Sequence, residues 1–222
     1  ESLYRRALEI RESTLGPNHP ETAYTLNALG VLCHGQGKIN EAISYTERAA
    51  HLYKTIWGNS NIDVARVLHN LAGYYRVVGK FYEAERLYLE TLNIKQKLLP
   101  ENHPDVAITY YQLAELYKVQ GFPQKAEPLC VKCLKIWEEI YGPDDIHVGN
   151  ALCLWAEVLK FLGRLEESEN HYKRALELWK KIYGPEHPNV ATTLNNLAET
   201  HRFQQRYIEA EKLYFDAIDL WR

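Results

Sequence analysis

Five side chains that carry, or on protonation acquire, a positive charge recur at one spacing in the 222-residue sequence. The spacing is 42 residues, and the five are His34, Arg76, Lys118, Lys160 and Arg202. Guanidinium and ammonium groups bind carboxylates through charge-assisted hydrogen bonds. The row therefore indicates a surface that holds acidic side chains.

A second set of side chains repeats with the same period, on two adjacent positions of each unit. These positions hold Asn27-Ala28, His69-Asn70, Tyr111-Gln112, Cys153-Leu154 and Asn195-Asn196. Amide groups can hold a peptide backbone through paired hydrogen bonds. Amides beside cations predict an extended, acidic peptide as the ligand. The candidate binding residues are the five cations together with Asn27, His69, Asn70, Tyr111, Gln112, Asn195 and Asn196.

The alternative is that the cations only form local pairs. Glu115, Glu157 and Glu199 each stand three residues before a cation, within reach on the same helix. Val31 and Gly73 occupy that place in the first two units. If pairing is local, His34 and Arg76 lack a compensating acid, so we expect the N-terminal end of the surface to accept the peptide.

Cys130 and Cys133 have the spacing of half a metal or redox site, which places both thiols on one helical face. Cys133 occupies a position that holds Ala49 and Ala175 in other units, and no second pair has ligand spacing. We interpret both cysteines as packing residues and expect no metal and no cofactor. Trp137, Trp179 and Trp221, also 42 residues apart, are expected to pack between successive units.

Histidine–proline pairs recur in alternate units, at His19-Pro20, His103-Pro104 and His187-Pro188. Proline suits the first turn of a helix, where its missing N–H costs nothing, and an acidic follower suits the helix N-terminus. Histidines two units apart are too distant for one metal, because helix layers are roughly 8 to 10 Å apart. The pairs therefore predict helix starts rather than a catalytic or metal site.

The elements that position these side chains follow from glycines and small residues. Gly16, Gly58, Gly142 and Gly184 lie on a 42-residue ladder whose missing rung is Pro100, another helix terminator. Small residues recur at three further positions, which predicts closely approaching antiparallel helices. They are Gly30, Ala72, Ala114, Ala156 and Ala198; Ala42, Ala84, Ala126, Ser168 and Ala210; and Ala49, Thr91, Cys133, Ala175 and Ala217.

The segments LNNLAETHRFQQRYIEAEKLY (194–214) and LAGYYRVVGKFYEAERLY (71–88) resemble the tetratricopeptide repeat, whose common unit has about 34 residues. The longer period, together with YRRALEIRE (4–12), is similar to the repeats of the kinesin light chain cargo-binding domain. This resemblance covers the whole chain and implies an all-α, right-handed α-solenoid of helix-turn-helix repeats. It also implies that the first helix of each repeat lines a concave groove containing the candidate binding residues.

We expect one domain over residues 1–222, excised from a longer protein. Residues 1–15 form the second helix of a preceding repeat, and five repeats follow at 16–57, 58–99, 100–141, 142–183 and 184–222. Eleven helices are predicted: one near 2–15 and pairs near 20–57, 62–99, 104–141, 147–183 and 188–222. Uncapped apolar ends predict some self-association. In the fourth repeat, Cys153, Leu154 and Trp155 form either an apolar pocket or ordinary packing.

The composition excludes several classes of protein. Hydrophobic residues make up 46%, charged residues 25%, and the net charge of −3 lacks the basic excess that nucleic-acid binding needs. No apolar run approaches the roughly 20 residues of a membrane span, so no membrane insertion is expected. Four cysteines without a disulfide-like framework indicate a reducing compartment, which we take to be the cytoplasm.

The sequence contains no P-loop, no dinucleotide-binding glycine motif and no G-x-S-x-G elbow, so no enzyme is predicted. We expect a scaffold or adaptor that binds an acidic partner segment, as the resemblance to kinesin light chain implies. The alternative is a regulatory or oligomerising arm of a multidomain signalling NTPase or ciliary scaffold. In that case the groove would be filled in cis.

Overall fold

The structure is a computed structural model that describes residues 1–221, and helix is the only regular secondary structure in them. The helices are α1 (Ser2–Thr14), α2 (Pro20–Gly35), α3 (Ile39–Trp57), α4 (Ile62–Val77), α5 (Phe81–Leu98), α6 (Pro104–Val119), α7 (Pro123–Tyr141), α8 (Ile146–Phe161), α9 (Leu165–Tyr183), α10 (Pro188–Phe203) and α11 (Tyr207–Trp221). The all-α prediction and the predicted helix pairs are confirmed.

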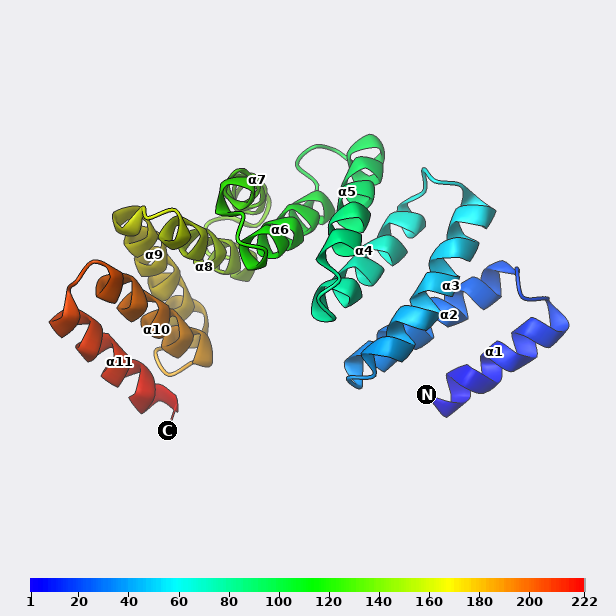
Figure 1. The fold of residues 1–222 in the computed structure, drawn as a ribbon, viewed down its shortest axis with the longest axis horizontal. Coiled ribbons are helices and arrows are strands. Elements are labelled where there is room, and N and C mark those ends of the chain that lie inside the picture. The colour runs from blue at the N-terminus through cyan, green and yellow to red at the C-terminus, as the bar shows by residue number, and fades with distance from the viewer. Residues whose placement is uncertain (222) are drawn as a thin grey trace. The chain divides into compact units, whose positions relative to one another are not determined.

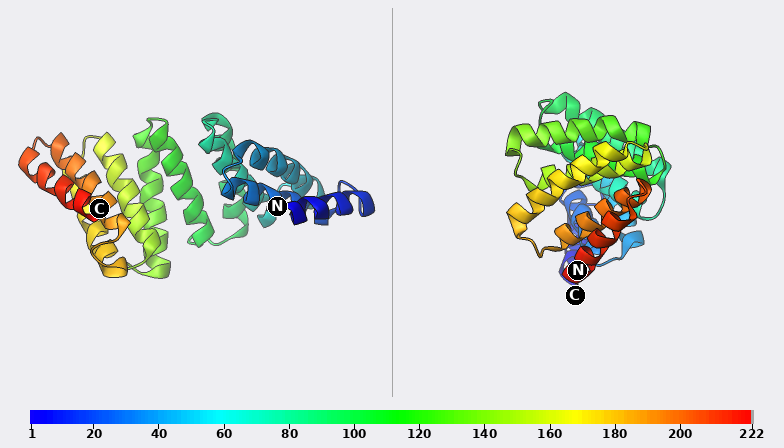
Figure 2. Two further views of the ribbon diagram at one scale, coloured as in Figure 1. Left: turned by 90° about the horizontal axis from the view of Figure 1, so that it is seen from below. Right: turned by 90° about the vertical axis from the view of Figure 1, so that its left-hand side faces the viewer.

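We call α2, α4, α6, α8 and α10 the A helices and their followers, α3, α5, α7, α9 and α11, the B helices. The chain divides into two compact units, residues 1–101 and 102–222, and each is described by itself. Within a unit every A helix packs against its own B helix, and each B helix contacts the next A helix (Figure 1). In the second unit α9, α10 and α11 lie side by side in both Figure 1 and Figure 2. The single-domain expectation remains a prediction.

All five A helices begin with the same side-chain cap. Nδ1 of His19, His103 and His187 accepts a hydrogen bond from the backbone N–H two residues later, at 3.1 to 3.2 Å. In the other two helices Oδ1 of Asn61 and of Asp145 accepts the corresponding bond, at 2.7 and 2.8 Å. Proline follows the histidine caps at the first helical position. The predicted role of the His-Pro pairs at helix starts is confirmed.

The small residues lie where the helices of a pair meet. All fifteen of the recurring small positions are buried. At Gly30 on α2, a Cβ atom would lie only 2.1 Å from Oγ1 of Thr46 on α3. In the fourth repeat, Oγ of Ser168 on α9 donates to the carbonyl oxygen of Ala156 on α8 at 2.7 Å. The predicted close approach of the two helices is confirmed.

Two of the three periodic tryptophans are core residues. Trp137 and Trp179 are buried, and the Trp137 ring contacts Tyr111 on α6 and His147 on α8. The prediction is wrong for Trp221, whose side chain is exposed. The reason is that no further A helix in the described residues covers the end of α11.

Cys130 and Cys133 are completely buried on α7, and Sγ of Cys133 donates to the carbonyl oxygen of Cys130 at 3.3 Å. Burial raises the pKa of Cys133 to about 12 and raises the pKa of Cys130 as well. Since the thiolate is the form that reacts and binds metals, burial supports the interpretation of both as packing residues.

We predict that Cys130 and Cys133 resist alkylation in the native protein at pH 8. Both should react fully after unfolding in urea, because burial keeps them as thiols out of contact with the reagent. Peptide mapping by mass spectrometry after a timed pulse of iodoacetamide measures the modification of each cysteine. Labelling of either residue in the native protein at the rate of an exposed free thiol would contradict the packing interpretation.

The packing of Trp179 leaves no room for a side chain at Gly149 on α8. A Cβ atom there would lie 2.5 Å from the ring of Trp179, although the other repeats hold alanine at this position. At Gly73 on α4 the nearest atom, the Tyr88 hydroxyl oxygen, would be 3.5 Å away, an ordinary contact.

We predict that Gly149→Ala destabilises the protein by about 1–2 kcal/mol, because overpacking outweighs the gain in helix propensity. The matched control Gly73→Ala should be neutral or stabilising by up to about 1 kcal/mol. Urea unfolding followed by circular dichroism measures both changes. Equal effects of the two substitutions would show that Trp179 adjusts freely.

Candidate functional site

The five candidate cations lie in the last turns of the five A helices. Lys118 on α6 pairs with Glu157 on α8 at 2.5 Å, and Lys160 on α8 pairs with Glu199 on α10. Each lysine thus binds the glutamate of the next repeat, 39 residues later. The same-helix pairing considered from the sequence is wrong for both lysines, because adjacent A helices bring the next glutamate closer.

Exposure divides these cations into two kinds. The Lys118 and Lys160 side chains are 19% and 7% exposed, so their charges are largely enclosed by the ion pairs. The Arg202 side chain is 51% exposed and lies 3.8 Å from Glu199, which already binds Lys160. Arg202 is therefore the cation of the second unit that faces solvent.

At the N-terminal end, His34 is exposed and its ring stacks on Tyr74 of α4, with centroids 4.6 Å apart. In the second unit, the acid that pairs with each lysine comes from the following repeat. The corresponding position for His34 is therefore Gly73 rather than Val31. Arg76 is half-buried and is not without a partner. Gly73 offers no acid to His34, whereas Arg76 has a partner, so the expectation that the N-terminal end accepts the peptide remains a prediction.

The candidate amides differ in access. Asn27 is buried, and its Oδ1 lacks a hydrogen-bond partner among the described residues. The rings at the same position, His69 and Tyr111, contact Tyr88 on α5 and Trp137 on α7, so this position faces the B helix. Asn70 and Gln112 are half-buried.

Asn195 and Asn196 on α10 are half-buried, and their side chains are 3.5 Å apart. They precede Arg202 by seven and six residues. Seven residues bring a helix back to nearly the same face. This spacing places Asn195, which occupies the position that faces the B helix in other repeats, on the same side of α10 as the exposed guanidinium, whereas Asn196 lies about 120° away around the helix.

In the fourth repeat, Cys153, Leu154 and Trp155 replace the amide-rich segment of the other repeats, and these three residues are packing residues. Leu154 is buried, Trp155 stacks on His171 at 4.2 Å, and Sγ of Cys153 lies 3.7 Å from Oγ1 of Thr193. Cys153 also packs against the buried cluster that contains Tyr172. Of the two alternatives left open by the sequence, ordinary packing describes these residues.

The structure also reveals a feature that the sequence analysis missed. The last residue of α6, α8 and α10 is apolar and exposed: Val119 by 53%, Phe161 by 62% and Phe203 by 52%. We call these three residues the apolar stripe. Their 42-residue spacing is visible in the sequence, but nothing in one sequence distinguishes an exposed phenylalanine from a core residue.

One group in the described residues has the composition of a metal site, formed by Glu1, Cys33 and Glu41. Both carboxylates are already bound by cations: Arg5 lies 2.6 Å from Glu1 and 2.5 Å from Glu41, and Lys38 lies 2.6 Å from Glu1. Burial raises the pKa of the Cys33 thiol. We interpret this group as an ion-pair cluster that holds α1 against the first repeat.

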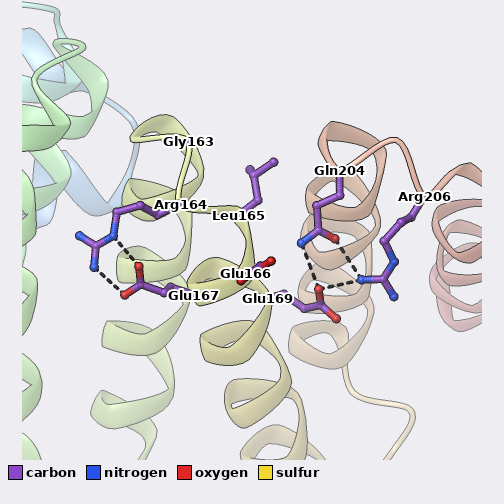
Figure 3. A pocket seen from close by; sticks show the side chains of 8 residues that line it. All are labelled: Gly163, Arg164, Leu165, Glu166, Glu167, Glu169, Gln204 and Arg206. Atoms are coloured by element: carbon purple, nitrogen blue, oxygen red, sulfur yellow. Dashed lines mark hydrogen bonds and ion pairs between the residues drawn. The ribbon is translucent and has the colours of Figure 1, made fainter.

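An open cleft of 760 Å³ lies at the turns of the fourth and fifth repeats. It is lined by Glu169, whose buried carboxylate on α9 accepts hydrogen bonds from Gln204 at 3.1 Å and from Arg206 at 2.8 Å (Figure 3). Outside the drawn residues, Lys173 lies 2.7 Å and His201 Nε2 3.3 Å from the same carboxylate. Since these groups from the fourth and fifth repeats already bind the carboxylate, we interpret the cleft as a structural contact between the two repeats.

Burial alone would raise the pKa of Glu169, but the hydrogen bonds from Lys173 and Gln204 and the charge of His201 lower it to about 2. A depressed pKa in the folded state means that ionised Glu169 stabilises the fold. This contribution is complete above the unfolded value of 4.5 and is lost as the pH falls toward 2.

We predict that Glu169→Gln lowers the free energy of unfolding by roughly 1–3 kcal/mol at pH 7, because Lys173, Gln204 and Arg206 lose an ionised acceptor. The difference from the wild type should shrink below pH 4.5. Thermal unfolding at several pH values measures it. The control Glu166→Gln, at an exposed position of the same cleft, should change little. An unchanged stability of Glu169→Gln would refute a structural role for this carboxylate.

No helix in residues 1–221 combines the length and the apolar character that a membrane crossing requires. Two curated relatives match part of the chain. Tetratricopeptide repeat protein 19, mitochondrial, of Homo sapiens is 31% identical over 86 residues, which is 39% of this chain and 22% of that protein. Protein KINESIN LIGHT CHAIN-RELATED 1 of Arabidopsis thaliana is 32% identical over 85 residues, which is 38% of this chain and 14% of that protein. The matches thus span less than a quarter of either relative.

Solved structures show the same fold. A putative kinesin light chain from Podosopora anserina with nearly identical TPR-like repeats has a TM-score of 0.79 at 20% identity, over 91% of this chain and 96% of that one. BtubC (BKLC) from P. vanneervenii has a TM-score of 0.81 at 18% identity, over 99% of this chain and 88% of that one. The resemblance to kinesin light chain repeats is confirmed. The tetratricopeptide repeat model matches residues 1–55, 63–121, 105–154 and 147–222, and the chain therefore belongs to the tetratricopeptide repeat family.

Proposed function

We propose that this chain is a non-catalytic scaffold that binds an extended, acidic segment of a partner protein along its A helices. The fold is consistent with a protein–protein interaction scaffold. The observation that carries the acidic preference is the exposed guanidinium of Arg202 at the end of α10.

Arg202 is suited to a carboxylate of the partner. Its neighbour Glu199 is shared with the buried Lys160, and the distance of 3.8 Å is too long for a strong hydrogen bond. The guanidinium lies 4.8 Å from the centre of the Phe203 ring. A guanidinium has five N–H donors in a fixed plane and binds carboxylates bidentately. Arg202 therefore keeps donors available for a ligand.

The amides of α10 supply the second part of the site. Asn195 is seven residues before Arg202, about 10 Å along the helix. An extended segment rises about 3.3 Å per residue, so the distance corresponds to roughly three residues. A backbone amide of the ligand can meet Asn195 while an acidic side chain further along reaches Arg202.

Self-association remains a prediction. Tyr207, Ile208 and Phe215 on α11 are exposed, which supports an association through this helix. The compartment is also a proposal: Cys33, Cys130 and Cys133 are free, buried thiols, as in proteins of the cytoplasm.

We predict that Arg202→Glu weakens binding of an acidic peptide about tenfold or more, a change of about 1.4 kcal/mol. The probe is a fluorescein-labelled 12-residue peptide with three acidic residues, compared with its Asn/Gln counterpart by fluorescence polarisation at two salt concentrations. Only the acidic peptide should bind, and salt should weaken it because the charges are screened.

The matched control is Lys135→Glu, which reverses a still more exposed charge, 75% against 51% for Arg202, on the B helix α7. It should leave the affinity unchanged. Light scattering establishes whether each variant is monomeric, so that an occluded surface is recognised. Absence of acidic-peptide binding to the monomer, or equal loss in both variants, would refute the role of Arg202.

A further inference from the structure

The apolar stripe lies at the C-terminal ends of three successive A helices of the second unit. The A helices that carry it touch one another, α6 with α8 and α8 with α10. Nζ of Lys160 lies 5.8 Å from the centre of the Phe161 ring and 5.9 Å from that of Phe203. The two rings therefore flank one ammonium group and are no more than about 12 Å apart.

The charges beside the stripe are compensated along most of its length. Lys118 and Lys160 pair with Glu157 and Glu199, so the two lysines nearest in sequence to Val119 and Phe161 are compensated. The exception is the Phe203 end, where Arg202 is exposed. A purely acidic ligand would contact one exposed cation, Arg202, whereas the larger part of the apolar stripe offers it no charge. Exposed apolar side chains gathered on one face commonly mark an interaction site.

The spacing of the stripe limits the form of the ligand. Packed helices lie roughly 8 to 10 Å apart, and an extended chain rises about 3.1 to 3.4 Å per residue. One helix therefore corresponds to about three residues of a ligand in the polyproline II conformation, in which every third side chain returns to the same face, whereas side chains three apart in a β-strand point to opposite faces. A helical ligand would instead need apolar residues about seven positions apart to cover the same distance.

We propose that the apolar stripe binds an extended partner segment in the polyproline II conformation, with an apolar side chain at every third residue and an acidic residue beside the last of them. The three apolar side chains contact Val119, Phe161 and Phe203 in turn, and the acid meets Arg202. This inference rests on the proposed scaffold function and specifies the partner further: beside the acid that meets Arg202, the segment carries apolar side chains at a fixed spacing.

Selection from a random 12-residue peptide library on the immobilised protein tests the pattern directly. Enriched peptides should share apolar residues at positions i, i+3 and i+6 and an acidic residue near the last. A synthetic peptide of that pattern should bind Phe161→Gln at least tenfold more weakly than the wild type. Phe161→Leu, which keeps an apolar contact, should restore most of the affinity.

The matched control is Tyr82→Gln on α5, a B helix of the first unit, where an aromatic side chain is 77% exposed. It should leave binding unchanged, and circular dichroism establishes that both glutamine variants are folded. Enriched peptides with apolar residues at alternate positions, or seven apart as in a helix, would overturn the proposal. Equal affinity for Phe161→Gln and the wild type would do the same.

The acidic probe separates this inference from the proposed function. If the probe binds in an Arg202-dependent way while selection yields no three-residue pattern, the scaffold function stands and the apolar register is wrong. If the probe fails and no peptide is enriched, both proposals are wrong.

Discussion

The close contact between the two helices of each repeat is the constraint on which the other features depend. Gly30 cannot carry a Cβ atom without meeting Thr46, and Ser168 reaches the backbone of Ala156 directly. When a backbone approaches this closely, side chains on the opposite sides of the helices are held at fixed positions. The glutamate of one A helix then stands beside the lysine of its neighbour, as in the Lys160–Glu199 pair. The arrangement of charge on the A helices is therefore a consequence of packing.

This consequence changes what a row of cations means. In the sequence, Lys118, Lys160 and Arg202 are equivalent members of a ladder. In the structure the first two pair with acids of the next repeat, whereas Arg202, on the last A helix of the described residues, is exposed and lies 3.8 Å from Glu199. A periodic charge is thus a ligand-binding charge only where the neighbouring repeat does not neutralise it.

The sequence predicts what depends on local chemistry. A histidine before a proline caps a helix through an atom two residues away, and alanines at one spacing mark a helix contact, so caps, helix bounds and close approaches are all recovered. The pairing of Lys160 with Glu199 depends on the distance between two helices, which spacing alone does not contain. For the same reason, the sequence pattern groups Trp221 with its buried counterparts and does not distinguish the exposed Phe161 from core residues.

The ion pairs and the apolar stripe are physically compatible, and each favours the other. The ring of Phe161 shields the ammonium group of Lys160, which lowers the local dielectric and strengthens its attraction to Glu199. A ligand that covers the rings would remove still more water from that pair. Desolvating an isolated cation costs several kcal/mol, whereas a neutral, hydrogen-bonded pair loses less. Paired lysines therefore allow an apolar segment to cover these charges at a lower desolvation cost. Arg202 then fixes the orientation of the segment by binding its acidic side chain.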